Sequence, residues 1–330
     1  MRWGFSFIFV CSLLLSRAQQ IQLMPSGVNT SIRGLSVVND RIIWASGTKG
    51  MVGSSTDSGK TWNWISVRGF EQTDFRDIEA FDETSAVIMG VGSPAYILRT
   101  SDAGSSWKVV YENRDTAMFL DAMHFWNELS GIVIGDPVNG KLFVGRSFDG
   151  GFSWKAIAPE LLPKADSGEA FFASSGTNVR ALNLQEALFV TGGKRSRVFI
   201  RDYSIALPIL QGKESTGANS IAVANPKKWI ITGGDFMQRD STNGNCIITR
   251  NGGISWEVPS EPPHGYRSCV EFIKKNIWIT CGLNGVDLSI DDGKNWKLIS
   301  TTGFHVCRKA KKGNSVFLAG GNGRIGKLIW

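Results

Sequence analysis

Arginine and carboxylate side chains recur at similar intervals along this chain of 330 residues, each time next to a short apolar run. The recurring set is Arg33, Arg76 with Asp77, Asp121, Glu169, Asn219, Arg267 and His305. Guanidinium groups bind carboxylates through paired hydrogen bonds, so such a set can hold an anionic or polar partner. Two carboxylates at a suitable separation can instead hydrolyse a glycosidic bond. A third interpretation is that the charges only neutralise one another.

An eight-residue motif indicates which elements position these residues. The motif reads Ser/Thr, any residue, Asp/Asn, any residue, Gly, any two residues, Trp. Its copies begin at Ser55, Thr100, Ser147, Thr249 and Ser289. Because a catalytic site is needed only once, five copies indicate a structural role.

Each octet has the residues of a capped turn between two strands. The hydroxyl and carboxylate can accept hydrogen bonds from turn amides, and the glycine permits a backbone angle that side chains disfavour. The tryptophan then buries a large ring against the neighbouring sheet. We assign this role to Asp57, Trp62, Asp102, Trp107, Asp149, Trp154, Asn251, Trp256, Asp291 and Trp296. No octet offers the alternating oxygen donors of a calcium loop, and we expect neither a metal nor a cofactor.

The spacing of the octets predicts the fold. Seven apolar runs that end in small residues, such as IIWASG at 42–47, each follow another strand-like piece, such as AFFASSG at 170–176 in the fourth unit. The fourth unit has only a decayed octet, near Arg201. Seven units of about four strands predict an all-β protein, a seven-bladed β-propeller of four-stranded antiparallel blades. The seventh unit ends at Trp330 after three strands, so we expect residues 21–24 to complete the last blade.

The N-terminal residues 1–18 have the pattern of a secretory signal peptide, with an early arginine, an apolar run and small residues before Gln19. An uncleaved N-terminal anchor is the alternative. We expect residues 19–330 to form a single propeller domain that is exported, periplasmic or extracellular, and monomeric. No later run approaches the length of a membrane span, so we expect a protein that does not span the membrane. A formal charge of +7 without a dense basic run does not indicate nucleic-acid binding.

The octets resemble the Asp-box, or bacterial neuraminidase repeat, of sialidases, other glycosidases, sortilin-type receptors and photosystem II stability and assembly factors. Longer stretches are more selective: FRDIEAFDETSAVIMGVGSPAYILRTSDAGSSW, GDPVNGKLFVGRSFDGGFSW, GEAFFASSGTNV and GVDLSIDDGKNW. They look like the exported bacterial branch related to the assembly factors, whose members are often labelled oxidoreductase or glycosyl hydrolase. This resemblance covers nearly the whole mature chain and implies a noncatalytic propeller that binds a client protein. It also implies a binding role for Arg33, Arg76 and Arg267.

In a propeller the first strand of each blade lines the channel, and its start shares a face with the loops between the second and third strands. Those loops add Lys49, Tyr96, Asp136, Lys194, Arg195, Asp235 and Arg324 to the recurring set. We expect a partner or ligand to be bound by Arg33, Arg76, Arg267, Asp77, Glu169, His305, Tyr96 and Arg195. The insertion at 233–245, with Phe236 and Met237, either overhangs this face or is a solvated hairpin.

An enzyme remains the alternative function. A sialidase would carry the sequence Phe/Tyr-Arg-Ile-Pro, whereas the three arginines here lie in IRGL, FRDI and YRSC. Another glycosidase could draw its carboxylates from Asp136, Glu169, Asp121 and Asp235. We favour an exported noncatalytic binding protein whose partner is a protein client or a polar or anionic ligand, a glycan included.

The four cysteines of the mature chain lie in its last third. Aligning the units places Cys269 and Cys307 where other units have Leu35 and Ile78, so they are expected to be packing residues. A disulfide between Cys269 and Cys281 is the alternative, because the turn between their strands sets them nearly opposite. Their spacing is not that of a CxxC metal site.

Overall fold

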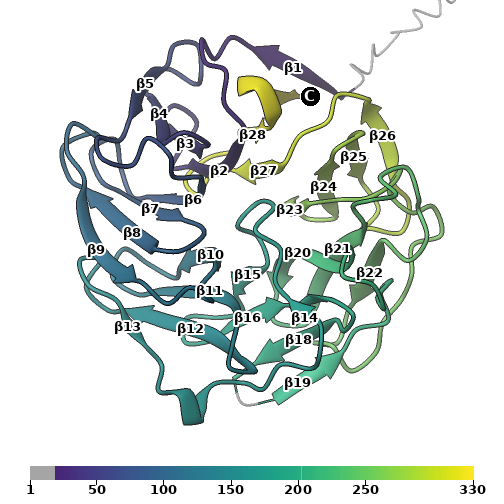
Figure 1. The fold of residues 1–330 in the computed structure, drawn as a ribbon. Helices are drawn as coiled ribbons and strands as arrows, with labels where there is room; N and C mark the ends of the chain where they lie inside the picture. The colour runs from purple at the N-terminus through teal and green to yellow at the C-terminus, as the bar shows by residue number, and fades with distance from the viewer. Residues whose placement is uncertain (1–18, 202) are drawn as a thin grey trace, which may run out of the picture.

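Seven β-sheets stand around one axis like the blades of a propeller in the computed structural model, which describes residues 19–201 and 203–330 (Figure 1). The predicted signal peptide lies outside the described residues. Within them, no helix is long and apolar enough to cross a membrane. The only helical elements in the described part are two 3-10 turns, η1 (Pro159–Leu161) and η2 (Gly321–Gly323).

In four blades, the four antiparallel strands are consecutive along the chain and are ordered from the channel to the rim. Blade 1 contains β2 (Ile32–Val37), β3 (Ile43–Gly47), β4 (Met51–Ser55) and β5 (Asn63–Ser66). Blade 2 contains β6 (Phe75–Ala80), β7 (Ala86–Gly90), β8 (Ala95–Thr100) and β9 (Lys108–Asn113). Blade 3 contains β10 (Leu120–Phe125), β11 (Gly131–Val138), β12 (Lys141–Ser147) and β13 (Lys155–Ala156). Blade 6 contains β23 (Cys269–Lys274), β24 (Ile277–Gly282), β25 (Gly285–Ser289) and β26 (Lys297–Ser300).

The fourth and fifth blades are joined by two short extra strands. Blade 4 contains β15 (Val179–Ala181), β16 (Ala187–Val190), β18 (Arg197–Ile200) and β19 (Tyr203–Ala206). Blade 5 contains β20 (Thr216–Asn225), β21 (Lys228–Asp235) and β22 (Cys246–Thr249), with its outer position held by the isolated bridge between Ile248 and Glu257. The sheet of blade 5 is extended by β17 (Gly192–Gly193) and β14 (Glu169–Ala170).

The two ends of the described chain meet in blade 7 and close the ring. β27 (Val306–Lys309), β28 (Val316–Ala319) and β29 (Ile325–Ile329) form its inner strands, and β1 (Gln20–Met24) pairs antiparallel with β29 from Gln20↔Ile329 to Met24↔Ile325. The predicted closure by the N-terminal strand is therefore confirmed. The pairing covers the edge of β29, which would otherwise be the exposed edge of a three-stranded blade.

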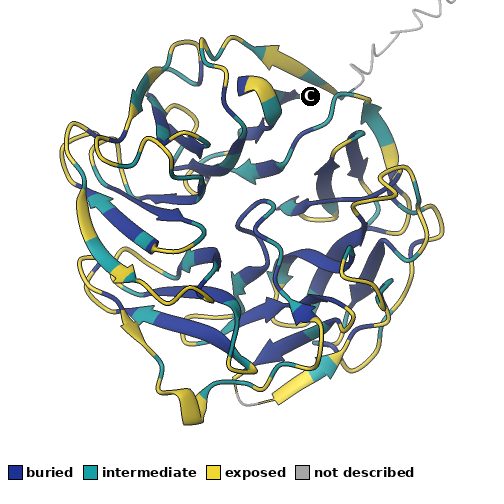
Figure 2. Ribbon diagram, viewed as in Figure 1, coloured by how far each residue is buried: buried dark blue, intermediate teal, exposed yellow. Residues whose placement is uncertain are grey.

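The second strands of the blades are apolar because each is covered on both faces by its neighbours. β3 and β7 are buried at every residue, and Trp44 of β3 is 1% exposed. Exposed residues gather on the outer strands and loops of the ring (Figure 2). The indole nitrogen of Trp44 donates to the carbonyl oxygen of Asp82 in the next blade, 3.0 Å away. Stacked apolar second strands therefore form the core between blades.

The octets are turns closed by their own side chains. In the first, the amide of Gly59 donates to the hydroxyl of Ser55 at 2.9 Å, and the amide of Thr61 donates to the carboxylate of Asp57 at 2.9 Å. The same amide-to-hydroxyl bond recurs from Gly104, Gly151, Gly253 and Gly293 at 2.8–3.1 Å. Gly59 has a φ of +78°, a conformation that glycine adopts without steric cost. All five turns lie at the end of the propeller opposite the starts of the channel-lining strands.

The expectation that AFFASSG at 170–176 forms the inner strand of blade 4 is wrong. Only Glu169–Ala170 are extended there, as β14, and the inner strand is β15, about ten residues further along the chain. The hydroxyls of Ser174 and Ser175 bond to other parts of the chain and Gly176 has a φ of +62°, so the backbone turns instead of continuing as a strand. The decayed octet near Arg201 does form a hairpin, between β18 and β19.

The hydrogen bonds of the octets predict a loss of stability in acid. They lower the pKa of Asp57 to about 2, first through the amide and hydroxyl of Thr61. An unfolded aspartate titrates near about 3.9, so the stabilisation is complete above that pH and is lost as the pH falls from about 4 to 2. We expect the thermal unfolding midpoint to fall over this range, and to fall less steeply for Asp57→Asn.

The fifth-blade octet supplies the reciprocal control, because its carboxylate position is held by Asn251, which does not titrate. Asn251→Asp should steepen the decline of the midpoint between pH 4 and 2. If the unfolding midpoint fell equally steeply with pH for the parent chain and both variants, the assigned role of the octet carboxylates would be contradicted.

Candidate functional site

A loop from blade 4 enters the central channel. Residues 171–178, here called the crossing segment, link β14 to β15, and this part of the chain reaches toward the centre of the ring (Figure 1). Residues 175–178 are fully buried. The channel of this propeller is therefore occupied by its own backbone at about mid-depth.

The crossing segment is held by residues from the blades around it. The hydroxyl of Ser174 bonds to Asn219 Oδ1 at 3.0 Å and lies 3.3 Å from the Tyr266 hydroxyl. The hydroxyl of Ser175 donates to the carbonyl of Ser268 at 2.8 Å, and that of Thr177 donates to Ser220 at 2.6 Å. These bonds satisfy the side-chain hydroxyls of the buried segment and attach it to blades 5 and 6.

Two arginines hold the segment by its carbonyl groups. Arg33 of β2 donates to the carbonyl of Ser174 at 3.4 Å. Arg308 of β27 donates from Nη2 to the carbonyls of Ser175 and Gly176, each at 3.2 Å. Gly176 itself packs against the carboxylate of Asp77, where an added Cβ would lie only 2.2 Å from Cγ. A side chain at position 176 therefore has no space.

Above the crossing segment, on the face predicted for the site, two arginines lie close together. Burial, and then repulsion from Arg76, lower the pKa of Arg33. Arg76 forms an ion pair with Asp74, Nε to Oδ2 2.7 Å, and its side chain is 29% exposed. Among the described residues no carboxylate lies within ion-pair distance of Arg33. The pair thus carries excess positive charge.

His305 and Arg324 extend this arginine region across blade 7. The Nε2 atom of His305 lies 3.3 Å from the hydroxyl of Ser31. Burial, followed by the charges of Arg33 and Arg324, lowers the pKa of His305 to about 3, so the imidazole is neutral at pH 7. Arg324 donates to the carbonyl of Gly303. We call Arg33, Asp74, Arg76, His305 and Arg324 the arginine cluster.

Two further predicted carboxylates lie beside this cluster. Asp121 is 0% exposed and neither of its carboxylate oxygens has a hydrogen-bond partner. Burial, and then the charge of Asp136, raise the pKa of Asp121 well above its usual range, while burial also raises the pKa of Asp136. The Asp136 carboxylate accepts a bond from the amide of Phe171 at 2.8 Å, which ties it to the crossing segment. The ion-pair partner of Arg76 among the described residues is therefore Asp74 alone.

The predictions that Arg267 and Glu169 face the channel are wrong. Arg267 is 0% exposed and forms a buried ion pair with Asp287 of its own blade, Nε to Oδ2 2.6 Å. Glu169 is 3% exposed and binds Arg197, with Nε to Oε1 3.0 Å. Each charge needs a partner because an isolated buried charge is very costly. Glu169 also lies in β14, outside the inner strand to which it was assigned.

Other predicted residues lie away from the arginine cluster or are covered. Asp77 is 1% exposed, and burial raises its pKa to about 7 while the Met123 amide donates to it at 2.8 Å. The Tyr96 hydroxyl donates to Glu112 at 3.4 Å within blade 2. Arg195 is 3.6 Å from Asp166, and Asp235 is 4% exposed and accepts the Met237 amide at 3.0 Å. The structure does not bring these four together.

The insertion of blade 5 packs an aromatic group over the crossing segment. Phe236 meets Phe172 edge-on at 5.7 Å between ring centroids, and Tyr266 at 6.3 Å. Phe236 is 38% exposed and Met237 is 75% exposed. We call Phe172, Phe236 and Met237 the apolar lip. It offers exposed apolar surface on the face that carries the arginine cluster.

On the octet side of the crossing segment the channel ends in a small charged cavity of about 110 Å³. Its charged walls are Glu79, Arg180, Glu271, Arg308, Lys309 and Lys311. Lys311 pairs with Glu79, and Arg180 lies 3.6 Å from Glu271. The crossing segment therefore separates this charged cavity from the arginine cluster on the opposite face.

Several of these residues escaped prediction from the sequence. Tyr266 and Asp74 each lie one or two residues before a predicted arginine, and this position is the signal in the sequence that points to them. Ser174 and Arg308 were missed because their roles depend on the crossing segment, which the strand pattern did not reveal.

Comparison with known proteins identifies the architecture. No family model matches the chain, and no curated protein matches it. Among solved structures, YCF48 from Cyanidioschyzon merolae is 16% identical with a TM-score of 0.67, over 93% of this chain and 98% of that one. YCF48 bound to D1 peptide is 14% identical with a TM-score of 0.65, over 94% and 95%. The WD40 propeller domain of Doa1 is 13% identical with a TM-score of 0.65, over 94% and 97%. At these identities the likeness concerns the fold.

Gly176 allows a direct test of the crossing segment. Gly176→Ala should lower the free energy of unfolding by about 2–4 kcal/mol, because the methyl group is strained at positive φ and also collides with Asp77. Gly69 is the matched control, since its φ is +84° and no atom lies within 4 Å of an added Cβ. Gly69→Ala should lower the free energy of unfolding by about 1 kcal/mol, with both variants measured by urea titration. Equal losses for the two variants would contradict the packing of the segment on Asp77.

Proposed function

We propose that this chain is an exported, noncatalytic binding propeller of the assembly-factor type, which recognises a polypeptide segment on its arginine-bearing channel face. The segment would place a carboxylate against Arg76 and Arg33 and an apolar side chain against the apolar lip. The observation that carries this proposal is the excess positive charge of the two neighbouring arginines beside exposed Phe236 and Met237.

A carboxylate ligand suits the arginine cluster for electrostatic reasons. Arg76 has one carboxylate partner, Asp74, on a side chain that is 24% exposed. Arg33 donates only to a carbonyl oxygen at 3.4 Å. An arriving carboxylate gains charge-assisted hydrogen bonds and reduces the repulsion between the two guanidinium groups. Because Arg76 is partly exposed, a ligand can reach it without unfolding any element.

A polypeptide suits the face better than a small ion. The apolar lip lies on the same face and supplies the aromatic surface that anchors peptides at protein interfaces. The resemblance to assembly factors that bind a client protein supports a protein partner. A solved propeller of the same fold, YCF48, is bound to D1 peptide. Export rests on the signal-like sequence of residues 1–18 alone.

The glycosidase alternative draws less support from the geometry. Glu169 is bound by Arg197, and Asp121 is fully buried with the crossing segment close to its partner Asp136. Retaining and inverting glycosidases need two carboxyl groups that both reach the scissile bond. Of the four candidate carboxylates, Asp136 alone is partly exposed, since Asp121, Glu169 and Asp235 are all buried.

The test uses a phage-displayed library of peptides with free C-termini, selected on the immobilised chain and followed by fluorescence anisotropy of the recovered peptides. We expect them to carry a carboxylate next to an aromatic or aliphatic residue, and to bind more weakly as salt rises. Arg76→Gln should weaken binding by about tenfold to a hundredfold, as expected for a lost hydrogen bond to a charged group, with an unchanged unfolding midpoint.

Arg114→Gln is the matched control, because Arg114 lies on the outer rim of blade 2 with its side chain 78% exposed. Binding that is indifferent to Arg76→Gln would overturn the assigned face. Turnover of aryl glycosides that Asp136→Asn abolishes would overturn the noncatalytic assignment.

A further inference from the structure

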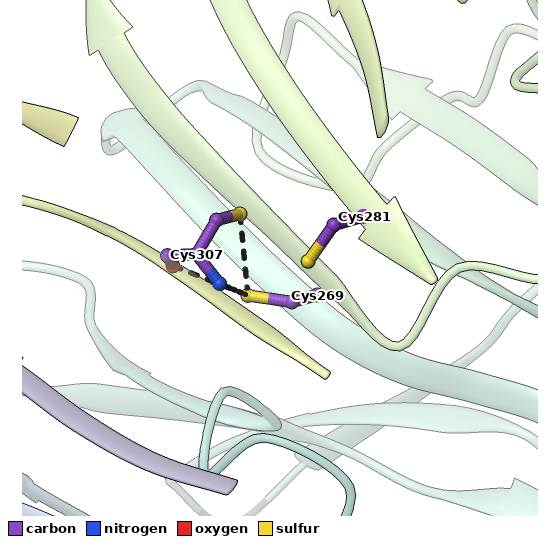
Figure 3. Close-up of side chains that lie close together, drawn as sticks. All are labelled: Cys269, Cys281 and Cys307. Carbon is purple, nitrogen blue, oxygen red and sulfur yellow. Dashed lines mark hydrogen bonds between the residues drawn. The ribbon is translucent and has the colours of Figure 1, made fainter. Parts of the chain in front are cut away.

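Three cysteines converge between blades 6 and 7. Cys269 of β23, Cys281 of β24 and Cys307 of β27 place their sulfur atoms within 4.8 Å of one another (Figure 3). Cys269 and Cys281 are direct partners across the β23–β24 pair, whereas Cys307 comes from the neighbouring blade. All three are 0% exposed and unpaired as disulfides. Among the described residues, this is the one group with the donor atoms and spacing of a metal site.

The three sulfurs are not equivalent. The Sγ atom of Cys269 accepts a bond from the amide of Cys307 at 3.3 Å and one from its thiol at 3.6 Å. When Cys269 is protonated, its thiol can instead donate to the Cys307 carbonyl at 3.3 Å. Cys269 therefore lies at the centre of the cluster, bonded to Cys307 of the next blade and opposite Cys281 of its own blade.

The spacing suits a three-coordinate metal ion. Metal–thiolate bonds of about 2.3 Å place three sulfurs about 4 Å apart in a trigonal plane. The measured separations, 3.6 Å for Cys269–Cys307 and up to 4.8 Å within the group, bracket that value. Small side-chain rotations would bring all three sulfurs onto one ion.

The surroundings select a soft ion of low charge. The cluster lies in an apolar core that contains Leu35, Ile279, Val306 and Leu318. No carboxylate or imidazole of the described residues joins the three sulfurs to give zinc its usual fourth ligand. Thiolate ligands select Cu(I), zinc and iron–sulfur clusters, and the last two take four protein ligands, so three sulfurs alone fit Cu(I).

We propose that Cys269, Cys281 and Cys307 form a buried trigonal site for Cu(I). Binding forms three Cu–S bonds and breaks the S–H bonds of the three thiols, with their three protons released to solvent. Arg308 follows Cys307 in β27 and offsets part of the negative charge of the thiolates. The ion reaches the site during folding or when blade 7 opens, because the sulfurs have no contact with solvent. The spacing of the cysteines in sequence gave no indication of this site.

The experiment uses the full mature chain, reduced and free of oxygen, with Cu(I) supplied as its bathocuproine disulfonate complex. We expect one Cu(I) to transfer to each chain, either on incubation of the native protein or on refolding with the complex present. Bound Cu(I) should add ultraviolet absorption from thiolate-to-metal charge transfer, should raise the unfolding midpoint, and should bind more tightly as the pH rises.

Cys246 provides the matched control, because it is also buried but lies in β22 of blade 5, outside the group. Cys281→Ala and Cys307→Ala should each weaken Cu(I) binding at least tenfold, whereas Cys246→Ala should leave it unchanged. Near-ultraviolet circular dichroism verifies folding. Cys281→Ser or Cys307→Ser replaces the corresponding alanine variant if that variant fails to fold.

Four results would overturn the site. The first is no transfer of Cu(I) to a chain with four titratable thiols by either route. The second is an equal loss of Cu(I) binding on Cys246→Ala. The third is tighter binding of Zn(II) than of Cu(I). The fourth is a count of only two free thiols when the purified, unreduced chain is unfolded, which would reveal a disulfide in place of a metal site.

Discussion

The structure depends on the contact between the crossing segment and the inner strands of the ring. A channel through seven blades exposes polar strand starts that must be solvated or paired, and here residues 171–178 pair them. Arg33 from above and Arg308 from below bond to consecutive carbonyls of the segment. Hydrogen bonds to charged groups contribute about 1.5–3 kcal/mol each, so these contacts stabilise both the segment and the position of the two arginines.

The same contact determines the form of the channel face to which we assign partner binding. With the channel filled, the arginine cluster and the apolar lip form a shallow floor instead of the wall of a deep pore. Phe172 belongs to the crossing segment and packs against Phe236 of the blade 5 insertion. The crossing segment therefore supports the apolar lip. A floor of this kind suits an extended peptide that lies across it. The octets close the hairpins at the opposite end of the propeller and take no part in this face.

The spacing of the octets and the seven apolar runs together were sufficient to predict seven blades and the closing strand, because turn capping and strand burial leave local patterns at fixed spacing. The prediction failed at AFFASSG, since an apolar run followed by small residues suits a strand equally well, and only the long-range partners Asn219, Tyr266 and Arg308 show otherwise. Arg267 was misplaced for the same reason, because its partner Asp287 lies 20 residues further on in another strand. Likewise, Cys269 and Cys281 were expected to face each other across a hairpin, but the approach of Cys307 from blade 7 depends on how blades pack.

Hydrogen–deuterium exchange of the native chain tests the central claim most directly. If the crossing segment fills the channel, peptides covering 171–178 should exchange as slowly as those covering the buried inner strand β20, and much more slowly than those covering the exposed insertion at 236–244. Exchange of 171–178 at the rate of the insertion would show that the segment does not occupy the channel. It would then contradict the placement of the arginine cluster and the charged cavity on opposite sides of the segment.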